Sequence, residues 1–352
     1  LAGPQGVAVS PDGSLYIADT GNHRIRRVSP SGIIATVAGG GAPGIVEGAL
    51  ATSVGLANPT SVVVGPDGSW YFSDWGLSRV FRVNSAGRIT TVAGRADGRG
   101  FSGDGGPATA ALLDFPYAVA VSSDGSIFIG DSSNRRVRRV GPDGIITTVA
   151  GNGGIGVGGD GGPATQASVA VVQEITIGSD GSLYLASADR VRRVGPDGII
   201  RRVAGGGSSP ANGILATQAQ FGFIEGLFVT ADGTLYIADA TTDRIREVTP
   251  DGMISTIGGT GIRGFSGDGG SPAAAQFNGP HGLALGFEGT LYIADTNNQR
   301  IRGLRSVFPG FAGISDIVLT SQDGSEGYIF NSRGKHLRTV NATTNSLIYS
   351  FG

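Results

Sequence analysis

Apolar residues alternate with polar ones in short stretches along the chain, and turns rich in glycine, proline and aspartate separate these stretches. The first unit contains four of them, at Val7–Val9, Leu15–Ala18, Arg24–Val28 and Ile33–Ala38. The turn at Pro11–Ser14 has a glycine where a tight turn needs a positive φ. Short alternating stretches joined by such turns are typical of antiparallel β-strands. Each unit therefore predicts four antiparallel strands.

The same order of strands recurs six times. The second strand of successive units ends at Asp19, Asp74, Asp131, Ser187, Asp239 and Asp295, which are 55, 57, 56, 52 and 56 residues apart. Self-similarity at this period indicates a repeat architecture, and four short antiparallel strands per repeat are typical of propeller blades. We therefore predict an all-β fold, a six-bladed β-propeller over residues 1–304.

A glycine-rich loop connects successive units. It reads Gly-Phe-Ser-Gly-Asp-Gly-Gly-Pro-Ala-Thr at 100–109, is nearly repeated at 264–275 and is shortened at 159–167. Proline between glycines and alanines predicts one short helical turn. The loop lacks the lysine of a phosphate-binding loop and the carboxylate spacing of a calcium loop. We interpret it as a blade connector.

The pattern changes after residue 304. Arg305–Pro309 leaves the repeat, so we expect the fourth strand of blade six to be irregular, absent or replaced by a segment near 314–320. Residues 317–351 resemble a compressed copy, with strands expected at 328–331 and 336–340. We predict a second, degenerate segment over 305–352. Because Leu1 aligns with Leu113, just after a connector, we also expect the chain to be part of a longer polypeptide.

Composition and charge exclude several classes of protein. The formal net charge is −2, and Lys335 is the only lysine, so nothing indicates a basic surface for nucleic acid. Cysteine is absent, which excludes disulfides and thiolate metal sites. No apolar run approaches the roughly 20 residues of a membrane-spanning helix. We expect neither a nucleic-acid partner nor membrane insertion.

An aspartate at the end of strand two and an arginine at the start of strand three recur together. The pairs are Asp19 and Arg24, Asp74 and Arg79, Asp131 and Arg136, Asp239 and Arg244, and Asp295 and Arg300. Such a charge-assisted pair can connect neighbouring strands or blades. Because a catalytic site is distinctive and these pairs are repeated, we interpret them as structural.

One repeat position varies, although a proline precedes it in four of the six blades, at Pro4, Pro59, Pro116 and Pro280. It is the residue that enters the innermost strand and is expected at the mouth of the central channel, namely Gln5, Thr60, Tyr117, Gln173, Glu225 and His281. Polar and aromatic groups that converge on a concave mouth predict a ligand-binding site. The alternative is that a hydrated mouth tolerates any polar residue.

The sequence predicts no catalytic residues, metal or cofactor. A catalytic zinc normally has three protein ligands, but the three histidines belong to different parts of the repeat. His23 is in an outer loop, His281 is at the channel and His336 is in the final segment. Glu225 and His281, from adjacent blades, could share a divalent ion, but no third ligand accompanies them. No nucleophile and base are paired either.

Residues 7–28, Val-Ala-Val-x-Pro-Asp-Gly-x-Leu-Tyr-Ile-Ala-Asp-x-x-Asn-His-Arg-Ile-Arg-Arg-Val, resemble the NHL family of β-propellers. The Phe-Ser-Gly-Asp-Gly-Gly-Pro-Ala-Thr connectors are similar to those of teneurins and of bacterial teneurin-like Rhs (YD-repeat) proteins. Residues 323–330, 334–340 and 347–352 are similar to the first strands of a YD-repeat β-shell. The resemblance implies that residues 305–352 begin such a shell and that the propeller lies outside the cell or on its surface.

The resemblance favours a non-catalytic recognition or scaffolding module of a large secreted or surface-attached protein. Its partner would be a protein, a glycan or the downstream β-shell of the same polypeptide. Two alternatives remain at this point. Some NHL-like propellers are metal-dependent amidating lyases and other six-bladed propellers are calcium-dependent lactonases, both of which use the central channel. Other NHL domains bind single-stranded RNA, which requires clustered cations beside exposed aromatic residues.

Overall fold

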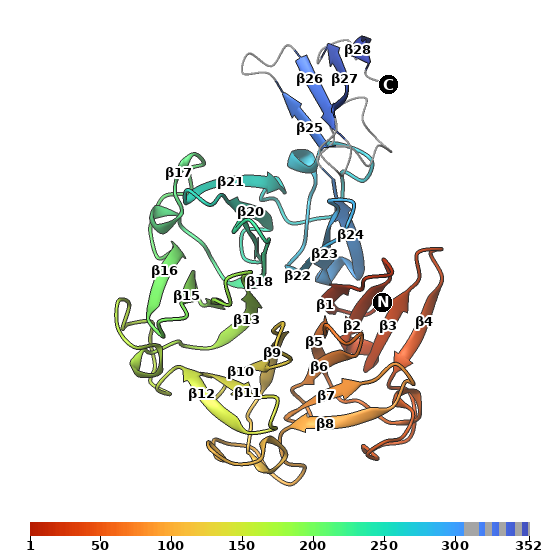
Figure 1. Cartoon of the computed structure of the whole chain (residues 1–352), viewed down its shortest axis with the longest axis vertical. Helices are drawn as coiled ribbons and strands as arrows, with labels where there is room; N and C mark the ends of the chain where they lie inside the picture. The colour runs from red at the N-terminus through yellow and green to blue at the C-terminus, as the bar shows by residue number, and fades with distance from the viewer. Residues whose placement is uncertain (306–316, 321–325, 331–335, 342–346, 351–352) are drawn as a thin grey trace. The chain divides into compact units, whose positions relative to one another are not determined.

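The computed structural model describes residues 1–305, 317–320, 326–330, 336–341 and 347–350. The chain divides into two compact units, residues 1–304 and 305–352, and each is described by itself. The first unit is a ring of six β-sheets around a central channel (Figure 1). This arrangement confirms the predicted all-β, six-bladed propeller.

Every complete blade is an antiparallel sheet in which strand order follows the sequence. Blade one contains β1 (Pro4–Val9), β2 (Leu15–Asp19), β3 (Arg24–Val28) and β4 (Ile34–Ala38). Blade two contains β5 (Pro59–Val64), β6 (Trp70–Asp74), β7 (Arg79–Val83) and β8 (Ile89–Ala93). Blade three contains β9 (Pro116–Val121), β10 (Ile127–Asp131), β11 (Arg136–Val140) and β12 (Ile146–Ala150). In these three sheets the first strand lines the channel and the fourth lies at the outer edge (Figure 1).

The remaining blades vary at their outer edges. Blade four contains β13 (Val172–Ile177), β14 (Leu183–Ser187), β15 (Arg190–Val194) and β16 (Ile200–Gly205). Blade five contains β18 (Ile224–Val229), β19 (Leu235–Asp239), β20 (Arg244–Val248) and β21 (Met253–Gly258), with β17 (Ile214–Leu215) added beside β21. Blade six contains β22 (Pro280–Leu285), β23 (Leu291–Asp295) and β24 (Arg300–Leu304). Within the described residues this sheet has three strands, and 306–316 lie outside them.

Apolar side chains on alternate strand positions fill the space between neighbouring blades. Between blades one and two the core is aromatic: the ring centroids of Tyr16 and Trp70 are 5.4 Å apart, and those of Phe72 and Phe81 are 5.2 Å apart. Phe72 and Phe81 are fully buried. Buried aromatic rings contribute much of the apolar area that stabilises a core.

The connectors contain the expected short helical turns, which are 3-10 turns. They are η2 (Ala51–Ser53), η3 (Ala108–Ala110), η4 (Ala164–Gln166), η5 (Ala216–Gln218) and η6 (Pro272–Ala274); two further turns, η1 (Thr20–Asn22) and η7 (Thr296–Asn298), follow β2 and β23. Each connector reaches the outer edge of the blade that follows it. In blade three, the N–H of Gly105 donates to the carbonyl of Ile146 over 2.8 Å, and the N–H of Ile146 donates to the carbonyl of Gly106 over 3.0 Å. The connector therefore extends the sheet.

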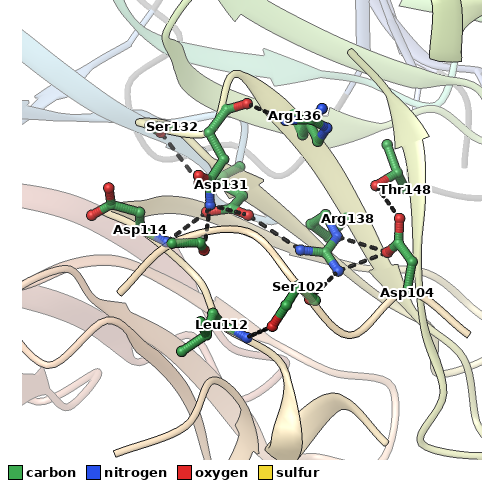
Figure 2. Close-up of polar contacts among 12 residues, drawn as sticks. Ser102, Asp104, Leu112, Asp114, Asp131, Ser132, Arg136, Arg138 and Thr148 are labelled. Atoms are coloured by element: carbon green, nitrogen blue, oxygen red, sulfur yellow. Dashed lines mark hydrogen bonds and ion pairs between the residues drawn. The ribbon is translucent and has the colours of Figure 1, made fainter. Parts of the chain in front are cut away.

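The repeat position at the end of strand two holds a buried aspartate in five of the six blades, as Figure 2 shows for Asp131. Its carboxylate accepts hydrogen bonds from the N–H of Asp114 over 2.8 Å and from Asn134 Nδ2 over 2.9 Å. Burial raises the pKa of Asp131 to about 6, against the opposing effect of these bonds. The ion-pair partner of Asp131 is Arg138, whose Nη1 lies 3.4 Å from Oδ2.

The ion pairs differ from the predicted ones by two residues. Asp131 faces Arg136 in the strand register, but the guanidinium of Arg136 lies 3.8 Å from the ring centre of Phe101 instead. The equivalent pairs are Asp19 with Arg26, at 3.8 Å, and Asp295 with Arg302, at 3.5 Å. In the described part of the chain, the predicted partners Arg24, Arg79, Arg136, Arg244 and Arg300 form no ion pair.

The second unit contains an antiparallel four-stranded sheet. Its strands are β25 (Ile317–Thr320), β26 (Glu326–Phe330), β27 (His336–Asn341) and β28 (Leu347–Ser350). The strands expected at 328–331 and 336–340 overlap β26 and β27. That this sheet begins a β-shell stays a prediction.

Candidate binding site at the channel

The first strands of all six blades enclose a cavity of about 240 Å³. Its lining comes from Gly6–Val9, Ser61–Val64, Val119–Val121, Glu174–Ile177, Leu227–Phe228 and Gly282–Leu285. Small residues let these strands approach closely, since a Cβ on Gly226 would lie 2.1 Å from the carbonyl oxygen of His281. Most of the lining residues are apolar, and Glu174 is the one with an ionisable side chain.

Glu174 departs from the repeat. The other blades have Gly6, Ser61, Ala118, Gly226 and Gly282 at this position. Its Oε1 accepts a hydrogen bond from the N–H of Ile175 over 2.9 Å. Burial raises the pKa of Glu174 to about 8, and the nearby charge of Glu225 acts in the same direction. The carboxyl is therefore mainly protonated at neutral pH, and it can donate as well as accept a hydrogen bond.

Glu225 links the residues of blades four, five and six. Gln173 Nε2 donates to both carboxylate oxygens of Glu225 over 3.2 Å, and His281 Nδ1 lies 4.0 Å from Oε2. Burial raises the pKa of Glu225 to about 7, although the bond from Gln173 opposes this effect. Burial lowers the pKa of His281 to about 4. At neutral pH the imidazole is uncharged, so this contact is not an ion pair.

Tyr117 of blade three completes the group. Burial raises the pKa of its hydroxyl well above the usual range, and the charges of Glu225 and Glu174 add to the effect. We name Tyr117, Gln173, Glu174, Glu225 and His281 the channel cluster; of these, only Glu174 lines the cavity itself. It joins four of the six residues predicted at the mouth with one that the sequence analysis missed.

The other two predicted residues behave differently. Thr60 is buried, and its hydroxyl contacts Ser73 Oγ over 2.9 Å and donates to the carbonyl of Tyr117 over 3.0 Å. These bonds connect blades two and three and leave Thr60 with a structural role. Gln5 has a buried amide oxygen without a hydrogen-bond partner among the described residues. An orphan acceptor of this kind is a candidate contact for a ligand or water.

A second group missed by the sequence analysis lies where the first strands begin. Phe115 has a φ of +51°, whereas Gly3 and Gly279 take positive φ at the same position in blades one and six. Its ring stacks on Trp75, with centroids 4.8 Å apart, and the guanidinium of Arg99 lies 5.0 Å from its centre. A bulky residue in left-handed backbone is uncommon and is often associated with function.

Blades four and five also carry apolar residues at this position. Val171 is 43% exposed and Phe223 is 54% exposed. We name the face of the ring on which the first strands begin the mouth face. Phe115, Val171 and Phe223 on this face come from blades three to five, which also supply most of the channel cluster, and Trp75 follows β6 of blade two. The mouth face is therefore asymmetric.

The channel cluster can form hydrogen bonds with a ligand. It offers an amide, a phenol, an uncharged imidazole and two carboxyl groups with raised pKa values. Within the residues that the structure describes, no three His, Asp or Glu side chains are arranged to hold a metal ion. No helix of that part of the chain is long and apolar enough to cross a membrane.

The fold and its repeats define the class of protein. The NHL repeat family matches residues 1–28 and 277–304, the first and the last blade. Solved structures share the architecture. A protein of unknown function from Bacteroides thetaiotaomicron has a TM-score of 0.62 and 21% identity, over 86% of this chain and 69% of that one. A gluconolactonase from Xanthomonas campestris has a TM-score of 0.55 and 14% identity, over 83% and 82% of the two chains. At these identities the likeness shows the fold alone.

Curated relatives then identify the family. Mouse teneurin-4 is 30% identical over the whole chain, and teneurin-m of Drosophila melanogaster is 26% identical over the same extent. The chain is an NHL-repeat propeller of the teneurin-like family, as its connectors led us to expect. It spans 14% of the length of each of these relatives.

Proposed function

We propose that this propeller is a non-catalytic recognition and scaffolding module of a larger teneurin-like protein. The observation that carries the proposal is the similarity to teneurins over the whole chain. By the same relationship we propose that it acts outside the cell or at the cell surface. Its partner is a protein or a glycan, or the β-shell that residues 305–352 would begin.

The mouth face is the proposed recognition surface. Exposed apolar side chains at Val171 and Phe223 border the polar channel cluster, and the stacked rings of Trp75 and Phe115 lie on the same face. Aromatic residues beside satisfied polar groups are typical of binding hot spots. Rigid blades hold these residues in place, so little conformational entropy is lost on binding.

Recognition can be tested with one pair of matched variants. The tag-free protein is probed against a glycan array and a set of purified cell-surface ectodomains. We expect saturable binding that weakens about tenfold or more in Phe223→Ser, because loss of a central apolar anchor costs upwards of about 1.4 kcal/mol. Phe287→Ser is the control, since Phe287 is 79% exposed but follows β22 at the opposite end of that strand. Equal losses in both variants would contradict recognition at the mouth face.

If no ligand binds, but deletion of the propeller from the full-length protein prevents shell assembly, a purely structural role is supported.

A metal-dependent propeller enzyme is the second candidate, because the channel cluster places Glu225, His281 and Glu174 in one region. Metal content of the purified protein separates the two functions. We expect well under one equivalent of zinc or calcium, since Gln173 already donates to both oxygens of Glu225. One equivalent that disappears in the Glu225→Ala, His281→Ala double variant would favour a channel-sited lyase or lactonase instead.

A further inference from the structure

An aspartate in each Asp-Gly-Gly connector binds an arginine of the following blade. The Nε of this arginine donates to the carboxylate: Arg138 to Asp104 over 3.1 Å, Arg192 to Asp160 over 2.8 Å and Arg302 to Asp268 over 3.0 Å. In blade three, Thr148 of the fourth strand also donates to Asp104 over 2.7 Å (Figure 2). Each of these bonds attaches a connector to the outer strands of the next blade.

Blade one has the receiving arginine without such a carboxylate. Arg26 occupies the repeat position of Arg138 and Arg192. Its Nε is buried and has no hydrogen-bond partner among the described residues, and its side chain is 21% exposed, whereas those of Arg138 and Arg192 are fully buried. A buried donor of a charged group without an acceptor is costly. Five other arginines in the part of the chain that the structure describes also have a buried Nε without a partner, so the comparison with its equivalents matters: Arg138, Arg192 and Arg302 each donate through this atom to a connector aspartate, and Arg26 does not.

The fourth strand of blade one is exposed where its counterparts are covered. Ile34 is 45% exposed, and its neighbour Ile33 is 67% exposed. The residues equivalent to Ile34 are Ile89, Ile146, Ile200 and Ile254, which are 0%, 0%, 0% and 1% exposed. A connector covers each of these counterparts, and the N–H groups of Ile89, Ile146 and Ile200 donate to carbonyls of the connectors. Strand β4 is thus an apolar sheet edge of the kind that accepts another strand.

The first residues of the chain lie in the same way as the residues that come directly after a connector in blade three. The N–H of Ala2 donates to the carboxylate of Asp19 over 2.7 Å, as the N–H of Asp114 does to Asp131 over 2.8 Å. In blade three, Asp104 precedes Asp114 by ten residues. If a segment before Ala2 took the course that residues 104–113 take in blade three, an aspartate ten positions before Ala2 would lie beside Arg26.

We propose that β3 and β4 of blade one form a docking surface for a connector-type segment with the sequence character Asp-Gly-Gly. The polypeptide on the amino-terminal side of Leu1 supplies this segment, and its aspartate accepts from Arg26. The three Asp-Gly-Gly connectors of residues 1–304 already dock on blades three, four and six. This interface closes the outer edge of blade one and is independent of the proposed recognition at the mouth face.

The test extends the full chain with its own connector sequence. A copy of residues 100–112 is joined directly to Leu1, which puts the copied aspartate ten positions before Ala2. We expect amide exchange at Ile34 to slow roughly 100-fold, to the range of Ile146, because the amide gains a partner and leaves solvent. The melting temperature is expected to rise by about 3 °C or more.

Two variants check that the acid and the arginine act together. In one variant the extension carries Asp104→Asn in the copied segment, and in the other the extended chain carries Arg26→Ala. Each should lose most of the added thermal stability, and a protein with both changes should lose little more. Unchanged exchange at Ile34 in the extended chain would overturn the proposal. Slow exchange at Ile34 in the unextended chain would also overturn it. If that protection depends on protein concentration, a second copy covers β4; if it disappears when residues 305–352 are removed, the second unit covers it.

Discussion

Replacing Arg138 by alanine is expected to lower the free energy of unfolding by about 3–5 kcal/mol. The side chain is fully buried and bonds Asp131, Asp104 and the carbonyl of Ser102. Its loss leaves the carboxylate of Asp131 buried without a cationic partner and removes the bonds from Arg138 to Ser102 and Asp104 of the connector. Removal of one partner from a buried ion pair is among the most destabilising single changes in a protein.

Arg139→Ala is the matched control, because the two arginines are adjacent on β11 and point to opposite faces. Arg139 is 38% exposed and pairs with Asp124 at the surface over 3.4 Å. An exposed pair of this kind contributes about 0–1 kcal/mol. Urea unfolding of both variants gives the comparison, and similar midpoints for Arg138→Ala and the unmodified protein would contradict the structural role of the network.

The repeat made the architecture predictable, but the sequence of a single blade did not predict which arginine pairs with Asp131. In strand register, Asp131 faces Arg136, so the shorter sequence spacing was chosen as the ion pair. The connector decides which of the two arginines pairs with Asp131. Its Phe101 lies against the guanidinium of Arg136, and its Asp104 fixes Arg138. Phe101 and Asp104 are more than 30 residues distant from these arginines in sequence, beyond any local pattern.

The candidate site shows a similar limit. Variation at the innermost strand singled out Gln173 and Glu225, which hydrogen-bond to each other, and a ligand at these residues stays a prediction. Strict alternation would place Glu174 on the face opposite to Gln173. The register of β13 shifts between Val172 and Glu174, so both consecutive residues lie near Glu225. A comparison of the next repeat position, where other blades have small residues, was the signal that could have found Glu174.

Replacing Glu174 by glutamine is expected to stabilise the protein at pH 8 by about 2–4 kcal/mol. Burial raises the pKa of this carboxyl to about 8, whereas glutamate in an unfolded chain titrates near 4.5. The folded state therefore keeps a proton that the unfolded chain releases. The contribution of protonated Glu174 is fully present below the unfolded pKa and is lost as pH rises through the folded pKa. Glutamine is uncharged throughout and avoids this loss.

The sign of the effect is tested by urea unfolding at pH 5, 6, 7 and 8. The difference between Glu174→Gln and the unmodified protein should be small at pH 5 and grow toward pH 8. Other groups, including His281 with its lowered pKa, contribute to both proteins and largely cancel in the difference. Glu288→Gln removes one exposed carboxylate and controls for the change in net charge.

The same measurement separates a channel that favours neutral groups from one that holds a cation. A divalent ion bound near Glu174 and Glu225 would stabilise their ionised forms and lower both pKa values, so added calcium or zinc would reduce the advantage of glutamine at pH 8. For the proposed recognition module we expect the same pH-dependent difference with and without these ions. If the difference is absent in ion-free buffer, the burial of Glu174 does not control its titration. If added metal reverses the difference, the channel is a cation site and the enzymatic alternative gains support.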